Sequence, residues 1–429
     1  MSEHFIRKRM LKSQIKSPVN IVLVLFSLLA FMLPVYKKPI PLIIVLLLVV
    51  LIYYTIREKT FRSFRLTTVS AASIGLYLLY AIGLLYTENM KSGLFDMEVK
   101  MSFLIFPLIF ALAAPFIKTG FRAQIEQVFI AGVLFSSLLS LTMAAIRYSE
   151  SQNIQEFFYI HFSRQFHPSY FAMYVNVALL LLMNNIFKQW FSFRKSKIAF
   201  LIVLCAFLIF IVFLANSKAG IIVTLISMLL FLIIKVFTIT NKKSGIAALI
   251  SFTALAILIW CLVPGVKSRF QQSYKSLTVF EQNQSTNPGE GSAQRIVIWK
   301  CSLRAIQDNP FVGTGTGDVH ETLDEKFMEY GFRYGVTLHR NTHNQYFQTA
   351  IALGVIGLLY LIFVFFSLIV HGIRNKEAVI AIIALVFLLH FMVESMLETQ
   401  AGTVYIAFCI SFFGMKGISE NKNNSESGH

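Results

Sequence analysis

The sequence predicts an all-α protein with about twelve transmembrane helices, and three observations support this fold class. Of the 429 residues, 56% are hydrophobic and only 14% are charged, whereas about 25% of the residues in soluble domains are charged. The apolar residues fall in blocks of about 17–25, the length that crosses the ~30 Å of hydrocarbon in a bilayer. The basic residues gather in alternate loops, as they do in polytopic membrane proteins.

The expected helices divide into two groups. Nine spans are predicted within residues 1–263 and three more within 344–416, and residues 417–429 read as a disordered cytoplasmic tail. The basic segment before the first span has no small-residue cleavage site after it, so we expect a retained span and not a signal peptide. The predicted spans are centred near Phe26, Leu47, Leu76, Ile109, Leu134, Ala178, Leu208, Ser227, Ala256, Gly357, Ala384 and Ala407.

The charge of the loops predicts the orientation of the chain. The loops 87–98 and 395–400 are acidic or neutral and fall on one side of the predicted membrane. With both termini in the cytoplasm, the basic loops fall on the cytoplasmic side. The net charge of +17 is then a consequence of topology, and nucleic-acid binding is not needed to explain it. The basic loops are residues 57–65, 188–197, 240–245 and 373–377.

One long loop, residues 264–343, is expected on the outer face. Residues 292–307 show helical periodicity through Ile296, Trp299, Leu303 and Ile306. A second helix is expected from about Asp318, so the loop is predicted to form a two-helix lid. The intervening "GTGTGD" lacks the Lys-Ser/Thr of a phosphate-binding loop, and we interpret it as a flexible turn.

His343 is the first candidate for chemistry. In "RNTHNQYF", Asn341 or Thr342 is expected to cap the tenth span and to leave His343 in its first turn. The positive end of the helix would disfavour an imidazolium there, and a neutral His is suited to act as a general base. The alternative is an interfacial His that caps the helix or binds lipid headgroups.

Two cations are candidates for binding phosphate. Arg295 lies in the first turn of the predicted lid helix, where a guanidinium can grip a pyrophosphate or merely anchor to lipid phosphates. Lys218 lies in "NSKAG", a short outer turn. A cation at that depth either has an anionic partner or extends its side chain to the headgroups.

Further candidates lie near the predicted outer ends of other spans. Arg164 and His167 precede the sixth span in "FSRQFHPSYF", and Lys100 follows an acidic pair in "FDMEVK". These three are candidate anion or substrate contacts. Asp96 and Glu98 form a weak divalent-ion candidate, and solvated acids are the alternative. His390 and Glu394 lie one turn apart, which favours a buried polar pair or a substrate contact.

The order of these features resembles that of a known family. Arg295 and Trp299 in an "R-x-x-x-W" pattern, followed by "NPFVGTGTGD" and "HNQYFQTAIALGVIGLL", are similar to the signature of O-antigen ligases and related O-antigen polymerases. The resemblance implies a GT-C-like membrane glycosyltransferase in the bacterial inner membrane, with its active site facing the periplasm. It also implies that Arg295 and His343 are essential. The family has Arg where this chain has Lys218, which keeps the charge but loses the bidentate fork.

The resemblance further implies the substrates. The donor is a glycan on undecaprenyl pyrophosphate, and the acceptor is a glycolipid such as lipid A–core or another glycan. No cofactor or metal is expected, because cations can stabilise the leaving pyrophosphate.

Two alternatives remain open at this stage. A polymerase would use the same donor and extend the glycan by its repeat unit. A lipid-linked glycan transporter or flippase would also have about twelve spans, but neither paired half-chain repeats nor Pro/Gly-interrupted helices are evident in the sequence.

Overall fold

The computed structural model describes residues 18–163, 165–189, 194–238, 250 and 291–415. These segments contain helices and connecting loops but no strand, which confirms the predicted all-α fold. Eight described helices are long and apolar enough to cross a membrane, and three shorter helices are also apolar. Eleven of the predicted centres fall within these helices. The predicted span near Ala256, the first part of the loop from Pro264, and the tail 417–429 lie outside the described residues.

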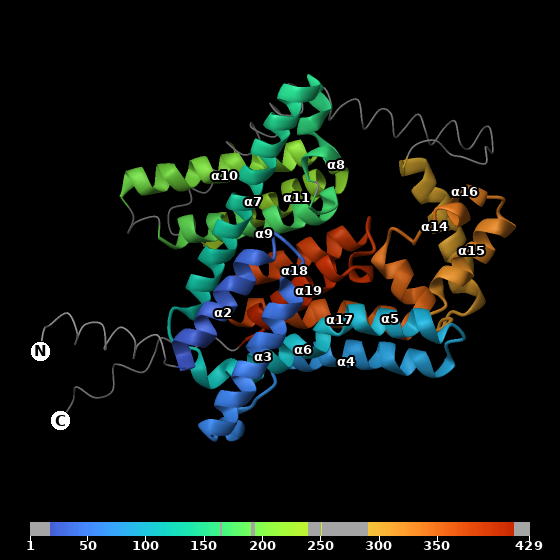
Figure 1. Cartoon of the computed structure of the whole chain (residues 1–429), viewed down its shortest axis with the longest axis horizontal. Coiled ribbons are helices and arrows are strands. Elements are labelled where there is room, and N and C mark those ends of the chain that lie inside the picture. The colour runs from blue at the N-terminus through green and yellow to red at the C-terminus, as the bar shows by residue number, and fades with distance from the viewer. Residues whose placement is uncertain (1–17, 164, 190–193, 239–249, 251–290, 416–429) are drawn as a thin grey trace, which may run out of the picture.

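The principal helices are followed easily by their labels in Figure 1. They are α2 (Pro18–Met32), α3 (Ile40–Arg57), α4 (Thr68–Gly83), α5 (Met90–Lys100), α6 (Ser102–Ala113), α7 (Phe121–Ser151), α9 (Pro168–Lys188), α10 (Lys195–Ala215), α11 (Lys218–Thr238), α17 (Gln345–Arg374), α18 (Ala378–Phe391) and α19 (Gln400–Phe413). Shorter pieces are η1 (Thr60–Ser63), η2 (Leu84–Tyr86), η3 (Ala114–Phe116), η4 (Ile154–Phe157), α8 (Tyr159–Phe162) and η5 (Met396–Glu398).

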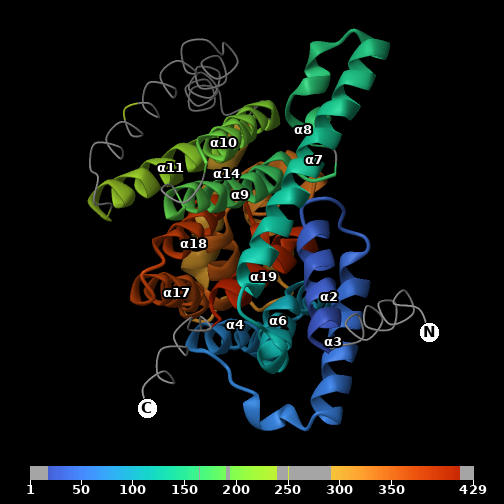
Figure 2. The same cartoon turned by 90° about the vertical axis from the view of Figure 1, so that its left-hand side faces the viewer.

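The helices pack around a central group made of α9, α17, α18 and α19. Helix α17 packs between α4 and α18, and α18 in turn contacts α9 and α11 (Figure 2). Of all the long spans described, α9 is the most enclosed, with 89% of its span buried. Its sequence is apolar on every face, as expected for a helix surrounded by others. Its one central amide, Asn176, is bonded by Thr224 of α11, so the buried polar group is satisfied.

Helix α17 is interrupted at Gly354. This residue has φ 64° and ψ −163°, a backbone conformation open only to glycine. The neighbouring loop fills the break: Thr314 N donates to Ile351 O (2.8 Å), Gly315 N donates to Ala352 O (3.0 Å), and Val355 N donates to Pro310 O (2.8 Å). The interruption therefore leaves no unpaired backbone group at these positions.

Two expectations from the sequence are wrong here. A Gly-interrupted span is present, although none was evident from the pattern. The "GTGTGD" segment is not a free turn, because its amides complete the hydrogen bonding of α17 and Thr316 Oγ1 donates to Tyr80 O at 2.6 Å. Asp318 accepts from the backbone N–H groups of Glu88 and Asn89 at 2.9 and 2.7 Å. The loop is thus hydrogen-bonded to both α4 and α17 and holds the two helices together.

Gly354→Ala is expected to destabilise the fold by about 3 kcal/mol, because it combines a strained backbone conformation with a steric clash. An added Cβ would lie 2.1 Å from Phe311 O. The matched control is Gly331→Ala, which also has a positive φ (77°) but meets nothing within 4 Å. The thermal midpoint of the detergent-purified chain measures both variants. Equal shifts in the two would contradict the close packing at Gly354.

The described part of the long loop forms three helices beside the ends of α4 and α5, at one end of the bundle (Figure 1): α14 (Gly291–Asp308), α15 (Val319–Glu329) and the short α16 (Arg333–Thr337). The two predicted lid helices are therefore present. The predicted apolar face of the first is only partly correct. Trp299 and Ile306 pack against the core, but Leu303 is 47% exposed, and the fully buried residues are Val297, Ile298 and Cys301. Helices α15 and α17 both pack against α14, and they determine which side of α14 is buried.

Candidate functional site

Polar side chains gather where α17 begins, α18 ends and α9 begins. The connection from Met392 to Thr399, which includes η5, crosses this end of the bundle, and α14 lies beside it (Figure 1). Most of the candidate residues from the sequence fall here. The described basic connections lie at the other end, since Arg65, Lys188 and Glu377 line one cavity there.

The residues of the segment "NTHNQ" (341–345) have different roles at the start of α17. Asn344, not Asn341 or Thr342, caps α17, accepting from Tyr346 N at 2.9 Å and Phe347 N at 3.2 Å. His343 therefore precedes the helix, and its predicted place in the first turn is wrong. It has φ 45°, uncommon for a non-glycine residue. Asn341 Oδ1 holds this conformation by accepting from His343 N at 3.0 Å.

Glu394 joins the two strongest candidates. Its Oε1 lies 3.0 Å from Nδ1 of His343, and its Oε2 lies 3.3 Å from Nη2 of Arg295. The Glu394 side chain is 8% exposed, whereas those of His343 and Arg295 are 21% and 31% exposed. The Glu394 carboxylate thus lies at the buried side of the cluster, and the side chains of His343 and Arg295 reach towards solvent.

The contacts within the cluster determine the protonation of Glu394 and the tautomer of His343. Burial alone would raise the pKa of Glu394, but the hydrogen bond from His343 and the charges of His343, Arg295 and His167 outweigh it and lower that pKa below its usual value. Glu394 is therefore a carboxylate at neutral pH. An anionic acceptor at Nδ1 keeps the proton on that nitrogen, so Nε2 of a neutral His343 presents its lone pair away from Glu394.

Buried hydroxyls and an indole hold this arrangement. Thr342 is fully buried, and its Oγ1 lies 2.9 Å from Oγ of Ser395, the residue after Glu394. Ser395 Oγ also accepts from Asn344 N at 3.2 Å. Trp299 Nε1 donates to Thr342 O at 3.1 Å, which ties the helix that carries Arg295 to the segment that carries His343. These hydrogen bonds hold together α14, the segment before α17, and the connection that contains Ser395.

His167 lies within the electrostatic reach of this cluster. Burial lowers its pKa, the charge of Glu394 opposes that shift, and those of Arg295 and His343 add to it, so His167 is neutral at pH 7. Its Nδ1 accepts from Ser169 N at 3.4 Å and caps α9. Lys218 begins α11 and is half-buried, and the preceding Ser217 has its Oγ 3.4 Å from Oγ of Ser169. Arg164 lies outside the described residues.

Lys100 occupies a neighbouring, deeper position. Its side chain is 1% exposed, and its Nζ lies 3.2 Å from Asp96 Oδ2 and 3.1 Å from Glu398 Oε2. Glu398 Oε1 accepts from Gln345 Nε2 at 3.3 Å, and Gln345 Oε1 accepts from Leu397 N at 2.7 Å. Lys100 thus supports the connection that carries Glu394. Its predicted contact with an anionic substrate stays a prediction.

The carboxylates first considered for a metal lie apart. Asp96 binds Lys100, whereas Glu98 is exposed two residues further along α5. Within the ranges that the structure describes, no group of three or more His, Cys, Asp or Glu side chains could hold a metal ion. His390 also differs from the expected pair with Glu394, because neither of its ring nitrogens has a hydrogen-bond partner among the described residues.

The role of Glu394 beside His343 was missed. The sequence offered one signal, an acidic residue directly after an apolar span, but it suggested His390 as the partner because the two lie one turn apart. Helix α18 ends at Phe391, so Glu394 no longer follows the helical spacing that the pairing assumed.

Together the fold and the site define a polytopic membrane protein with a Glu–His–Arg cluster, built around a buried glutamate, at one end of its helices. Residues 202–362 match the family model described as O-antigen ligase. The match confirms that this part of the chain is similar to the superfamily of O-antigen ligases and related polymerases. The matched region contains Lys218, Arg295 and His343, whereas Glu394 lies beyond it. No curated protein gives a significant match to the chain.

Proposed function

We propose that the chain transfers a glycan from undecaprenyl pyrophosphate to a surface acceptor such as lipid A–core, as an O-antigen ligase. The observation that carries this proposal is the cluster in which Glu394 bridges His343 and Arg295, two residues within the O-antigen ligase match. The cluster supplies a partly exposed base, His343, and a cation, Arg295, that shares its carboxylate partner. These are the two groups that attack on a pyrophosphate-linked sugar requires.

In the proposed reaction an acceptor hydroxyl attacks the anomeric carbon of the donor. The bond from that carbon to the pyrophosphate oxygen breaks, and undecaprenyl pyrophosphate leaves. Nε2 of His343 accepts the hydroxyl proton, and Glu394 stabilises the resulting imidazolium through Nδ1–H. Arg295 faces the negative charge that grows on the leaving group. His167 and Lys218 are proposed to bind the donor from the starts of α9 and α11, and Arg164 from the segment before α9.

The arrangement of the helices supports a periplasmic site. The cluster lies at the start of α17, whereas the basic Arg374 ends that helix and the basic Lys188 ends α9. Because cytoplasmic loops carry the excess of Lys and Arg, the end with Arg374 and Lys188 is assigned to the cytoplasm and the cluster to the opposite face. The donor is presented there without a nucleotide sugar.

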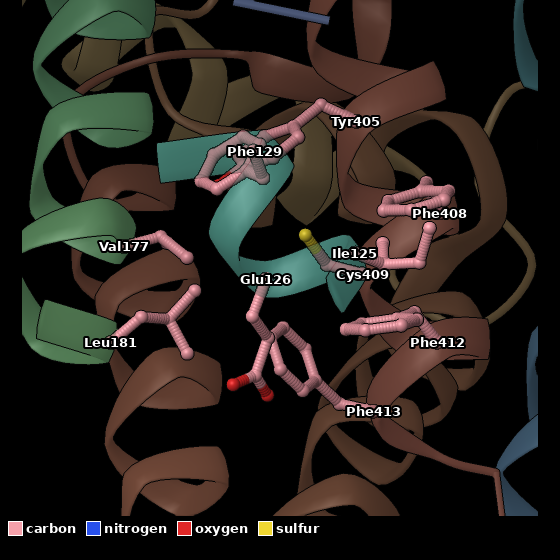
Figure 3. A pocket seen from close by; sticks show the side chains of 10 residues that line it. All are labelled: Ile125, Glu126, Phe129, Val177, Leu181, Tyr405, Phe408, Cys409, Phe412 and Phe413. Carbon is pink, nitrogen blue, oxygen red and sulfur yellow. The ribbon is translucent and has the colours of Figure 1, made fainter. Parts of the chain in front are cut away.

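The packing at the cytoplasmic side supports transfer over transport. Between α7, α9 and α19, apolar side chains including Phe129, Tyr405 and Phe412 surround a cavity of about 10 Å³ (Figure 3). That volume holds about one water. Among the described helices, the space between α7, α9 and α19 is therefore too small to admit a glycan.

A reconstituted assay tests the proposal. Undecaprenyl-pyrophosphate glycan and lipid A–core are supplied to the purified chain in liposomes, with EDTA present. We expect acceptor labelling by the wild type, and loss of at least about 100-fold in the transfer rate for His343→Ala and Arg295→Ala, since each removes a group that acts in the transition state. Arg147→Ala, in an ion pair with Glu156 away from the cluster, is the control and is expected to retain activity.

Other outcomes separate the alternatives. Longer glycan without labelling of the acceptor would identify a repeat-unit polymerase. Movement of intact donor between leaflets without transfer would favour a flippase. Full activity of both cluster variants would contradict the proposed site.

A further inference from the structure

A second cavity lies at the opposite end of the bundle from the Glu–His–Arg cluster. Its volume is about 1090 Å³, and it opens among the ends of α4, α7, α9, α18 and α19. The proposed transfer reaction makes no use of it. A helix of 21 residues such as α9 spans about 30 Å, so this cavity is separate from the site at the start of α17.

The charges around the cavity are mostly positive. Arg122 is engaged by two carboxylates, with Nε 3.0 Å from Glu126 and Nη1 2.5 Å from Glu377. Three more cations line the cavity, all of them exposed, and none forms an ion pair with a side chain in the described ranges. These three are Arg65, Lys118 and Lys188, and we call them the basic rim.

The inner wall of the cavity is apolar. Phe110 and Ile117 from the region of α6, Phe121 from α7, and Phe412 and Met415 from the end of α19 line it. At its inner edge lies the small aromatic-walled space of Figure 3, which shares Glu126 and Phe412 with the larger cavity. The cavity therefore combines exposed cations with a wall of apolar side chains.

We propose that this cavity binds an anionic phospholipid, with its phosphate at the basic rim and its glycerol and first acyl carbons against the apolar wall. A soluble anion would gain nothing from the aromatic wall, and a neutral lipid would leave the rim cations without a counter-charge. Basic pockets between the ends of transmembrane helices are suited to such headgroups. The rim lies at helix ends, the level at which lipid phosphates are found.

Calorimetric titration of the full chain in a neutral detergent tests this proposal. The probes are short-chain phosphatidylglycerol, the matching phosphatidylcholine, and glycerol 3-phosphate, which carries the phosphate without the chains. We expect the anionic lipid to bind at least about tenfold more tightly than either other probe. The combined variant Arg65→Gln/Lys118→Gln/Lys188→Gln is expected to weaken its binding by about 100-fold, because each cation contributes about a fivefold factor.

Two further variants make the result specific to the cavity. Lys59→Gln/Arg374→Gln/Lys376→Gln removes the same charge from exposed positions at the same end outside the cavity, and it is expected to leave binding unchanged. Ala114→Trp fills the cavity mouth without changing charge, and it is expected to abolish binding. Equal loss in the two charge variants, or tight binding by Ala114→Trp, would overturn the proposal. Glycerol 3-phosphate binding as tightly as the lipid would overturn the lipid assignment.

Discussion

Glu394→Gln is expected to lower the transfer rate by about 10²–10⁴-fold, the range that general acid–base catalysis supplies. Glutamine has the shape of glutamate but no charge, so it can neither stabilise the imidazolium that forms at His343 nor favour the Nδ1–H tautomer as strongly. The side chain lies 3.0 Å from His343 and 3.3 Å from Arg295. The single substitution therefore removes the charge that interacts with both His343 and Arg295.

The measurement is the initial rate of glycan transfer at equal protein in liposomes, across a range of pH. Because the pKa of Glu394 is lowered, the wild-type carboxylate persists through the neutral range, and the loss in the variant is expected at every pH from about 6 to 8. The control is Glu156→Gln, another carboxylate in a close ion pair, with Arg147 at 2.6 Å. Wild-type rates from Glu394→Gln would show that His343 does not depend on this carboxylate.

Lys100→Met is expected to destabilise the chain by about 3–5 kcal/mol, the cost of leaving buried charges without a partner. Its ammonium is the shared partner of Asp96 and Glu398, and it lies 4.8 Å from the centroid of the Tyr80 ring. Removal of the ammonium leaves two carboxylates close together at a site where the Lys100 side chain itself is 1% exposed. Glu398 belongs to η5, so we also expect the connection that carries Glu394 to shift.

The thermal midpoint and the transfer rate together measure this effect. The double variant Lys100→Met/Glu398→Gln is expected to regain part of the stability, because it removes one of the two stranded charges. Lys326→Met is the control, and it is expected to change stability little because Asp308 and Glu329 are each 54% exposed. Unchanged stability with reduced transfer would support the predicted contact of Lys100 with an anionic substrate.

The predicted helices were largely correct because they follow from local composition. An apolar block of sufficient length must form a helix in a bilayer, where every backbone amide needs an internal partner. That constraint acts within each span and needs no knowledge of its neighbours. The lid helix at Gly291–Asp308 was predicted for a similar reason, although its buried face was not.

The errors fall where a contact between distant segments decides the outcome. Gly354 in "IALGVIG" has no local sign of a break, since its conformation is stabilised by the amides of Thr314 and Gly315, some forty residues earlier. The start of the helix was placed two or three residues too early, which put His343 inside it, because Asn344 is an equally good capping residue. The sequence alone does not show which of Asn341, Thr342 and Asn344 caps the helix. The preference for Asn344 depends on Thr342 being buried against Ser395.

The sequence by itself determined the class of fold, the helices and the two residues, Arg295 and His343, that the family match also contains. Hydrophobic length and residue type are properties of the chain alone, so they can be read without coordinates. Only the tertiary structure decided that Glu394 is the partner of both residues and that Lys100 is buried between carboxylates. The contacts of Glu394 with His343 and of Lys100 with Glu398 join segments about 50 to 300 residues apart, and their energies depend on the burial and distance that packing alone creates.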